Sequence, residues 1–214
     1  MIASGSAVNR PPHIALDVRP VMLLPQAEEP APMIRGAFFT VLYLALAFGA
    51  NARSLEALRT GAMRSLVFHA TPVPVSQTPF TDMEGEEHLL SDMQGHYVLL
   101  NFWATWCAPC RHEMPYLNTL QRELGGEDFK VVTIATGRNP PPAIRRFFEE
   151  ASLDALPMYR DPGQEIARDM GVFGLPITVL ITPGGQEIAR LQGNADWASP
   201  EAMALLRALI AGGN

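Results

Sequence analysis

The stretch NFWATWCAPCR, residues 101–111, decides how the chain folds, and it contains the chain's only two cysteines, Cys107 and Cys110. The run before them, YVLLNFW at residues 97–103, is nearly continuous in apolar side chains, as expected for a central strand covered on both faces. The pattern after them predicts a helix over residues 109–124, with Gly125-Gly126 as its stop signal. A buried strand therefore leads directly into a Cys-x-x-Cys at the start of a helix.

This placement predicts chemistry for both cysteines. Cys107 stands where the free N–H groups and the dipole of the helix favour a negative charge, so its thiol should ionise more easily than the free value of about 8.5. Cys110 follows one helical turn later, close enough to form a disulfide with it. Attack by Cys107, formation of a mixed disulfide and resolution by Cys110 is the natural cycle, and we predict both as catalytic.

Two other interpretations compete, namely half of a metal site and a pair of inert buried cysteines. A structural disulfide framework would need more cysteines than two, spread along the chain. A zinc site would need two further ligands, but the five histidines are scattered and no second Cys or His pair has ligand spacing. The flanking Trp106 and Pro109 favour redox use, and we expect neither a metal nor a cofactor.

Composition limits the remaining classes of function. The chain has 214 residues, 48% of them hydrophobic and 18% charged, with a mean hydropathy of +0.07. This composition is typical of one globular domain with some appended sequence. The formal net charge of −6 offers no electrostatic attraction for nucleic acid, so we expect no nucleic-acid partner.

We expect the N-terminal part to be a targeting segment rather than part of the folded domain. Residues 36–50 form an uncharged apolar run, which is short because a spanning helix needs about 20 apolar residues. Arg35 precedes the run, and Ala50-Asn51-Ala52 has the small-x-small pattern of a cleavage site. We predict that residues 33–52 are a signal peptide, cleaved after Ala52, or else a short membrane anchor. A buried core helix is the alternative.

With this targeting segment, the chain is predicted to consist of four parts. Residues 1–32 are rich in proline, show no periodic pattern and are expected to be an unstructured extension. We hypothesise that the natural start is Met33. Residues 53–77 are interpreted as a linker, because Pro72, Pro74 and Pro79 hold the chain extended, and residues 78–214 as the folded domain. Export would deliver that domain to the periplasm, soluble after cleavage or tethered to the inner membrane.

The rest of the domain alternates strands and helices. A hairpin is expected over residues 80–86, turning near Glu84-Gly85, and a turn or short helix over 91–95. Ser199 and Pro200 have the pattern of a cap and first position of a last helix. This order predicts an α/β fold with a mixed central sheet flanked by helices. The remaining expected elements are strands at 130–136, 178–182 and 187–191, helices at 143–151 and 165–170, and an extended piece at 156–159.

Residues 80–211 resemble the TlpA/ResA/CcmG group of extracytoplasmic thioredoxins, the TlpA branch most closely. The resemblance is carried by NFWATWCAPCR, by Glu113-Met114-Pro115 and by Gly174-Leu175-Pro176-Ile177-Thr178. It implies a thioredoxin fold with an N-terminal hairpin near residues 80–88 and a helix–strand insertion at 143–159. It also implies that Leu175–Pro176 is a cis peptide bond opposite the cysteines.

The same resemblance suggests where a substrate would bind. In the family the loop before the cis-proline offers its backbone to an extended substrate segment, so Leu175 and Pro176 are substrate-binding candidates. A proline at a strand edge is the alternative for Pro176. Trp106 is expected to be exposed beside Cys107 as part of the docking surface, together with Ala108 and Pro109 between the cysteines.

One departure concerns the strand before the cysteines. Cytoplasmic thioredoxins carry a buried Asp where this chain has Asn101, and Asn cannot take up a proton. Glu113 follows Cys110 by three residues, which places both on one helix face. ResA-like proteins have an acidic residue at this site. We therefore hypothesise that a partly buried Glu113 tunes the Cys110 thiol and helps to carry protons. An ordinary solvated glutamate is the alternative.

The direction of electron flow is suggested by Ala108-Pro109, which resembles the Gly-Pro of reducing thioredoxins. We expect a reductant of disulfides in exported proteins, supplied by a membrane thiol electron donor. Apocytochrome c and the copper-assembly proteins of a terminal oxidase are the candidate partners that the resemblance suggests. The alternatives are a disulfide-donating oxidase or isomerase of the same fold, a peroxidase, and a copper-delivery protein.

Overall fold

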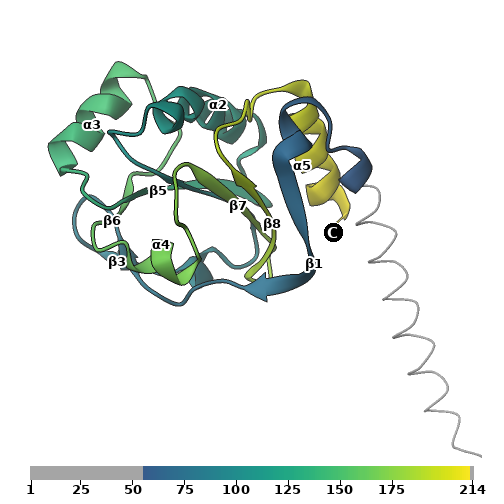
Figure 1. Cartoon of the computed structure of the whole chain (residues 1–214), viewed down its shortest axis with the longest axis horizontal. Coiled ribbons are helices and arrows are strands. Elements are labelled where there is room, and N and C mark those ends of the chain that lie inside the picture. The colour runs from purple at the N-terminus through teal and green to yellow at the C-terminus, as the bar shows by residue number, and fades with distance from the viewer. Residues whose placement is uncertain (1–54, 213–214) are drawn as a thin grey trace, which may run out of the picture. The chain divides into compact units, whose positions relative to one another are not determined.

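The computed structural model describes residues 55–212 (Figure 1). The predicted extension at 1–32 and the predicted signal peptide or anchor at 33–52 lie outside the described residues. The elements, in chain order, are η1 (Gly61–Ser65), β1 (Leu66–Pro74), β2 (Phe80–Thr81), β3 (Glu87–His88), η2 (Leu90–Met93), β4 (Tyr97–Trp103), α2 (Ala108–Leu124), β5 (Phe129–Thr136), α3 (Pro141–Glu150), β6 (Tyr159–Asp161), α4 (Glu165–Asp169), β7 (Ile177–Ile181), β8 (Gln186–Gln192) and α5 (Pro200–Gly212).

The strands of the described chain form one mixed sheet in the order β1-β8-β7-β4-β5-β6-β2-β3. Strand β4 lies in its middle, parallel to β5 and antiparallel to β7. Strand β6 continues the parallel part beside β5, whereas β8 and β1 add antiparallel strands on the other side. The predicted α/β class with a mixed sheet flanked by helices is confirmed.

The two faces of the sheet are buried in two separate cores. Every residue of β4 is buried, and alternate side chains point to opposite faces, as the strand period requires. One core gathers Leu99 and Trp103 with helices α2, α3 and α5, and the other gathers Leu100 and Phe102 with α4. Because β4 is covered on both sides, its sequence shows no polar alternation.

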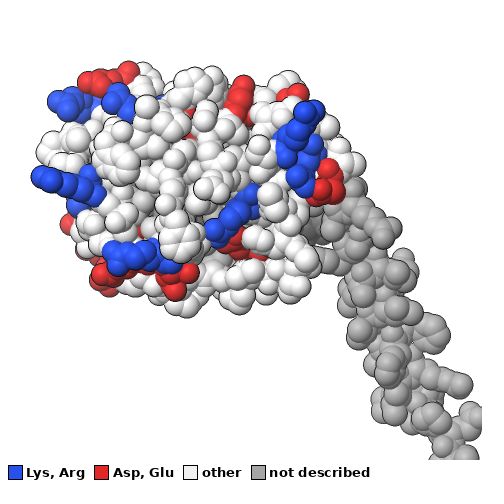
Figure 2. Space-filling model, in the orientation of Figure 1, with Lys and Arg blue, Asp and Glu red and all other residues white. Residues whose placement is uncertain are grey.

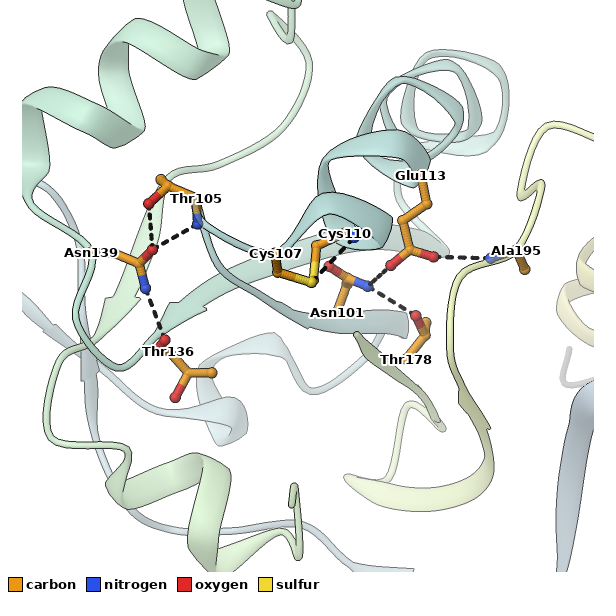
Figure 3. The surroundings of a disulfide bond; sticks show 9 residues. All are labelled: Asn101, Thr105, Cys107, Cys110, Glu113, Thr136, Asn139, Thr178 and Ala195. Atoms are coloured by element: carbon orange, nitrogen blue, oxygen red, sulfur yellow. Dashed lines mark hydrogen bonds between the residues drawn. A yellow bond between two sulfur atoms is a disulfide. The ribbon is translucent and has the colours of Figure 1, made fainter. Parts of the chain in front are cut away.

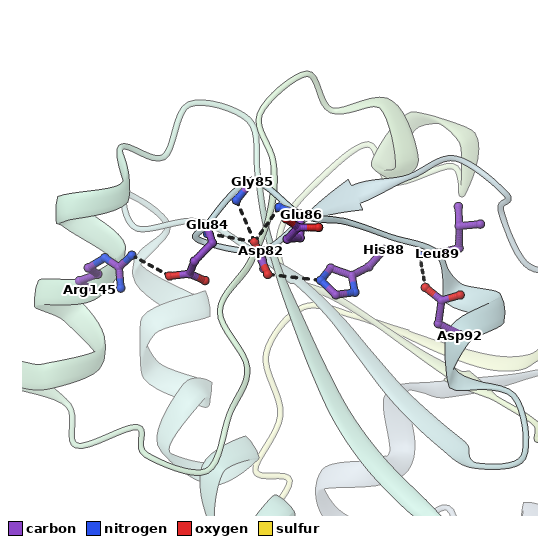
Figure 4. Close-up of polar contacts among 8 residues, drawn as sticks. All are labelled: Asp82, Glu84, Gly85, Glu86, His88, Leu89, Asp92 and Arg145. Carbon is purple, nitrogen blue, oxygen red and sulfur yellow. Dashed lines mark hydrogen bonds and ion pairs between the residues drawn. The ribbon is translucent and has the colours of Figure 1, made fainter.

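The N-terminal hairpin is held by one aspartate (Figure 4). Oδ1 of Asp82 accepts backbone N–H bonds from Glu84, Gly85 and Glu86 at 2.8–2.9 Å. Gly85 turns the chain at φ +94°, a conformation that glycine adopts without strain. Strand β3 then pairs with β2, so the predicted hairpin turning near Glu84-Gly85 is confirmed.

The predicted linker at residues 53–77 is wrong over most of its length. Within it, η1 and the nine-residue strand β1 belong to the domain, and β1 pairs with β8. Met63 and Leu66 are fully buried in the core. Pro72 and Pro74 suggested an extended linker. They lie in β1 instead, because proline is tolerated on an edge strand, where one side of the backbone needs no partner.

Two smaller differences concern the helix–strand insertion. Helix α3 begins at Pro141 rather than at residue 143, because proline is a favoured residue in the first turn of a helix. The extended piece expected at 156–159 is replaced by β6 at Tyr159–Asp161. Buried Asp161 ends that strand and accepts the backbone N–H groups of Glu165 and Ala167, so the strand and the start of α4 are fixed together.

Among residues 55–212, no helix combines the length and the apolar character that crossing a membrane requires.

Substitutions in β1 test whether this strand is structural. Leu66 faces the core opposite Leu191, whereas its neighbour Val67 is 55% exposed. We expect Leu66→Ala to lower the free energy of unfolding by about 2–5 kcal/mol, because it removes buried methyl groups and leaves a cavity. Val67→Ala should change it by less than about 1 kcal/mol. Urea unfolding of both variants measures the difference, and equal small effects would mean that β1 is not part of the folded unit.

Candidate functional site

The candidate site lies at one end of the central strands, where β4 and β5 have their carboxyl ends. Strand β4 leads through residues 104–107 into α2, so both cysteines lie at the start of this helix. Strand β7 runs antiparallel to β4, so its first residues, after the cis Leu175–Pro176 bond, lie at the same end. Because β4 and β7 run in opposite directions, the turn that carries the two cysteines and the loop that contains the cis-proline lie at the same end of these strands.

The two cysteines form a disulfide, with their Cα atoms 5.3 Å apart (Figure 3). Cys107 is the N-cap residue of α2, and its Sγ accepts the backbone N–H of Cys110 at 3.3 Å. Cys107 is 5% exposed and Cys110 is fully buried. Only Cys107 can therefore be reached from outside, and after reduction the helix N-terminus favours its thiolate.

Glu113 is completely buried beneath the disulfide-bearing turn, more deeply than predicted. Its Oε1 accepts an N–H bond from Asn101 at 2.8 Å, and its Oε2 accepts the backbone N–H of Ala195 at 3.1 Å. These contacts tie α2 to β4 and to the segment before α5 (Figure 3). The alternative of a solvated surface glutamate is wrong.

Burial raises the pKa of Glu113 from 4.5 to about 7, because removing the carboxylate from water disfavours its charged form. The N–H groups of Asn101 and Ala195 oppose this shift by stabilising the charge. The Trp197 indole, whose Nε1–H makes no hydrogen bond of good geometry, adds a weaker effect in the same direction. The carboxyl group can therefore gain or lose a proton near neutral pH.

Asn139 is a site residue that the sequence did not reveal. Its Oδ1 accepts both the backbone N–H and the hydroxyl of Thr105, at 2.7 and 2.9 Å, and its Nδ2 donates to the Thr136 carbonyl at 2.8 Å. It thus fastens the turn before Cys107 to the end of β5 (Figure 3). A single Asn in a proline-rich stretch carries no signal for such a contact.

A groove with a volume of about 460 Å³ opens beside Cys107. Trp106 and Phe173 flank it with 66% and 92% of their surfaces exposed, an unusual state for large apolar side chains. The nine residues that line the groove are Trp106, Cys107, Pro109, Thr136, Gln164, Val172, Phe173, Gly174 and Leu175, and none of them is charged.

The structure brings most of the predicted substrate-binding residues to this groove. Trp106, Pro109 and Leu175 line it, whereas Ala108 is exposed next to it and Pro176 is buried behind Leu175. The predicted cis bond between Leu175 and Pro176 is confirmed. Phe173 was missed, although an apolar Val172-Phe173 pair directly before Gly174-Leu175-Pro176 is a signal that could have been used.

No charged side chain lines the groove. Figure 2 shows Lys and Arg interspersed with Asp and Glu on the face drawn, without a gathered basic area in the part of the chain that is described. Within residues 55–212, His, Cys, Asp and Glu also form no group of three or more that could hold a metal ion. The reactive groups that the site presents are the two cysteine sulfurs and the buried carboxyl group of Glu113.

Comparison with known proteins places this site in a family. Residues 70–187, more than half of the chain, match the AhpC/TSA family. The chain belongs to the AhpC/TSA family. The thiol-disulfide oxidoreductase ResA of Bacillus thuringiensis subsp. konkukian is 35% identical over 113 residues, which are 53% of this chain and 64% of that protein. ResA of Geobacillus kaustophilus is 37% identical over 106 residues, 50% of this chain and 60% of that protein.

A solved structure agrees with these relatives. A protein of Chlorobium tepidum, studied as a candidate thiol:disulfide interchange protein DsbE, is 26% identical, with a TM-score of 0.56 over 67% of this chain and 97% of that one. The predicted thioredoxin fold and the resemblance to the TlpA/ResA/CcmG group are confirmed. That the TlpA branch lies closest stays a prediction. The chain spans less than two thirds of the length of the two ResA relatives.

The buried carboxyl group makes stability depend on pH. Between pH 4.5 and 7 the folded oxidised chain holds the Glu113 proton that the unfolded chain has lost, so stability falls as pH rises through this window. The free energy of unfolding should lose about 3 kcal/mol relative to Glu113→Gln, which cannot ionise. Urea titrations of both oxidised proteins at pH 4.5 and pH 8 measure this difference.

Glu123→Gln provides the matched control, because Glu123 lies on the same helix but is exposed to solvent. It removes the same charge and should follow the unsubstituted protein at both pH values. If Glu113→Gln also follows the unsubstituted protein, the carboxyl group does not titrate near neutral pH in the fold.

Proposed function

We propose that the chain is an exported thiol–disulfide oxidoreductase that exchanges disulfides with other proteins through Cys107 and Cys110. The observation that carries this proposal is the unequal placement of the two sulfurs. Cys107 lines an apolar groove at a helix N-terminus, whereas its partner Cys110 is fully enclosed. One sulfur is thus placed to meet a substrate and the other to release it. The ResA relatives, which carry the name of this activity, support the same assignment.

The cycle follows from this geometry. In the reduced protein, the Cys107 thiolate attacks one sulfur of a substrate disulfide, that S–S bond breaks, and the other substrate sulfur leaves as a thiolate that takes up a proton. Cys110 then loses its proton and attacks Cys107 Sγ. The mixed disulfide breaks, the second substrate thiol is released, and the Cys107–Cys110 disulfide forms. Two electrons pass from the protein to the substrate.

Glu113 is the proposed proton carrier for the buried half of this cycle. Cys110 must lose a proton before it can attack, but it is shielded from water. Glu113 lies one helical turn further along α2, and burial raises its pKa to about 7, near the pH at which transfer has to occur. It is therefore a positioning and proton-relay residue, whereas the two cysteines react with the substrate.

The groove fits an extended, uncharged substrate segment. Its lining contains no charged side chain, and Trp106 and Phe173 offer apolar surface on either side of Cys107. Leu175 borders the groove directly before the cis-proline, where its backbone can lie alongside such a segment and bind it. Recognition would therefore depend on shape and apolar contact rather than on charge.

We further propose that electrons flow outward, from a membrane thiol donor through this protein to disulfides of exported proteins. The Ala108-Pro109 dipeptide supports this direction, because strong oxidants place a His before the second cysteine, which stabilises the reduced form. The predicted signal peptide or membrane anchor at residues 33–52 supports the periplasm as the compartment in which the protein acts. Apocytochrome c and copper-assembly proteins remain the candidate clients. No contact in the described residues favours the peroxidase, oxidase or copper-delivery alternatives.

Trapping with single-cysteine variants tests the proposed exchange. Cys110→Ser leaves Cys107 as the chain's only thiol, and Cys107→Ser leaves only Cys110. With glutathione disulfide, we expect Cys110→Ser to accumulate a mixed disulfide, detected by mass spectrometry. Because Cys110 is enclosed, Cys107→Ser should react slower by on the order of 100-fold.

The unsubstituted reduced chain is the control, since Cys110 should expel glutathione and leave the internal disulfide. Equal reaction rates of the two variants, or an adduct that persists in the unsubstituted chain, would contradict the assigned roles.

A further inference from the structure

Asn101 has an unpaired oxygen in the most enclosed part of the site. The side chain is fully buried, and its Nδ2 donates two hydrogen bonds, to Glu113 Oε1 at 2.8 Å and to Thr178 Oγ1 at 2.9 Å. No donor among residues 55–212 reaches its Oδ1. A buried carbonyl oxygen without a partner costs about 1–3 kcal/mol, so its presence needs an explanation.

The orientation of this amide suits its neighbours. The nitrogen of Asn101 faces Glu113 Oε1 and Thr178 Oγ1, as the ionised form of Glu113 requires, because a carboxylate can only accept hydrogen bonds, and the oxygen faces the opposite way. Figure 3 shows that oxygen turned toward the disulfide. Among the buried side-chain N and O atoms without a partner in the described chain, it is the one acceptor, since the others are N–H groups of Arg59, Trp103, Arg160 and Trp197.

Reduction creates a donor that the oxidised protein lacks. When an incoming thiolate attacks Cys107 Sγ, the S–S bond breaks, and Cys110 Sγ leaves as a thiolate that takes up one proton. The new S–H group belongs to a residue without exposed surface, so water cannot accept its hydrogen bond. It needs an acceptor inside the protein, and the unpaired oxygen of Asn101 faces it.

We propose that Asn101 Oδ1 accepts a hydrogen bond from the Cys110 thiol in the reduced protein. Asn101 is then a positioning residue for the exchange reaction, and this role rests on the function proposed above. The two sulfurs receive opposite partners: the backbone N–H of Cys110 faces Cys107 Sγ and suits a thiolate, and the Asn101 oxygen suits a neutral thiol at Cys110. The charge is thereby assigned to the cysteine that meets the substrate.

This bond also affects the redox equilibrium. The oxidised protein carries an unpaired acceptor and the reduced protein does not, so the contact favours the reduced form. In the full chain, Asn101→Leu should shift the equilibrium with glutathione toward the disulfide by about threefold to tenfold. A tenfold shift corresponds to a reduction potential about 30 mV more negative.

The S–H stretching band in the infrared spectrum tests the bond directly. In full-length Cys107→Ser, the thiol of Cys110 is the only one in the chain, so a single band reports it. We expect a band at the low wavenumber of a hydrogen-bonded thiol, and a shift to higher wavenumber when Asn101→Leu is added. Thr178→Val is the matched control, because it removes the other partner of the same amide and leaves the oxygen in place. Its band should not move.

A band that keeps its position in Cys107→Ser/Asn101→Leu would overturn the proposal. If that variant does not fold, the Asn101 Cγ resonance of the unsubstituted ¹³C-labelled chain decides instead: it should move downfield on reduction as the carbonyl gains a donor, and an unchanged resonance would overturn the proposal equally. Neither measurement depends on exchange with a substrate. Failure of the proposed function would instead appear in the trapping of Cys110→Ser.

Discussion

The contact between Asn101 and Glu113 is the interaction on which the site depends. It joins the middle strand of the sheet to the helix that carries both cysteines, and the second Glu113 oxygen extends the link to Ala195, before α5. A carboxyl group enclosed this deeply is costly unless its oxygens are paired, and here each has one N–H donor. The first turns of α2 are thereby held against β4, with Cys110 between them and solvent excluded.

That enclosure separates the roles of two chemically identical side chains. Cys107 caps the helix and reaches the groove, whereas Cys110 has only protein around it. Because Cys110 has no exposed surface, we propose that nearby protein groups accept or supply the proton of its thiol. We propose Glu113 as the proton carrier and Asn101 as the hydrogen-bond acceptor for this thiol.

The sequence predicted the elements around the cysteines well, because their signals are local. The continuous apolar run of β4, the Cys-x-x-Cys and the double glycine after α2 each mark a boundary without reference to distant residues. The prediction of a linker at residues 53–77 was wrong because the signal for β1 is not local. This strand pairs with β8, far along the chain, and its prolines suggested an extended connector. Glu113 was placed on the correct helix face, but its complete burial depends on Ala195 and Trp197, far along the chain. Asn139 and Phe173 likewise depend on contacts or exposure that only the folded chain reveals.

The proposed donation of electrons to disulfides rests on the groove, on the Cys107 sulfur that borders it and on the Ala108-Pro109 dipeptide. The reduction potential of the full chain, equilibrated against glutathione, tests this account most directly. We predict a value near or below roughly −200 mV, toward the thioredoxin end of the range, at which the dithiol gives electrons to most disulfides. A value near about −120 mV would contradict the account, because a pair so easily reduced would donate its disulfide instead.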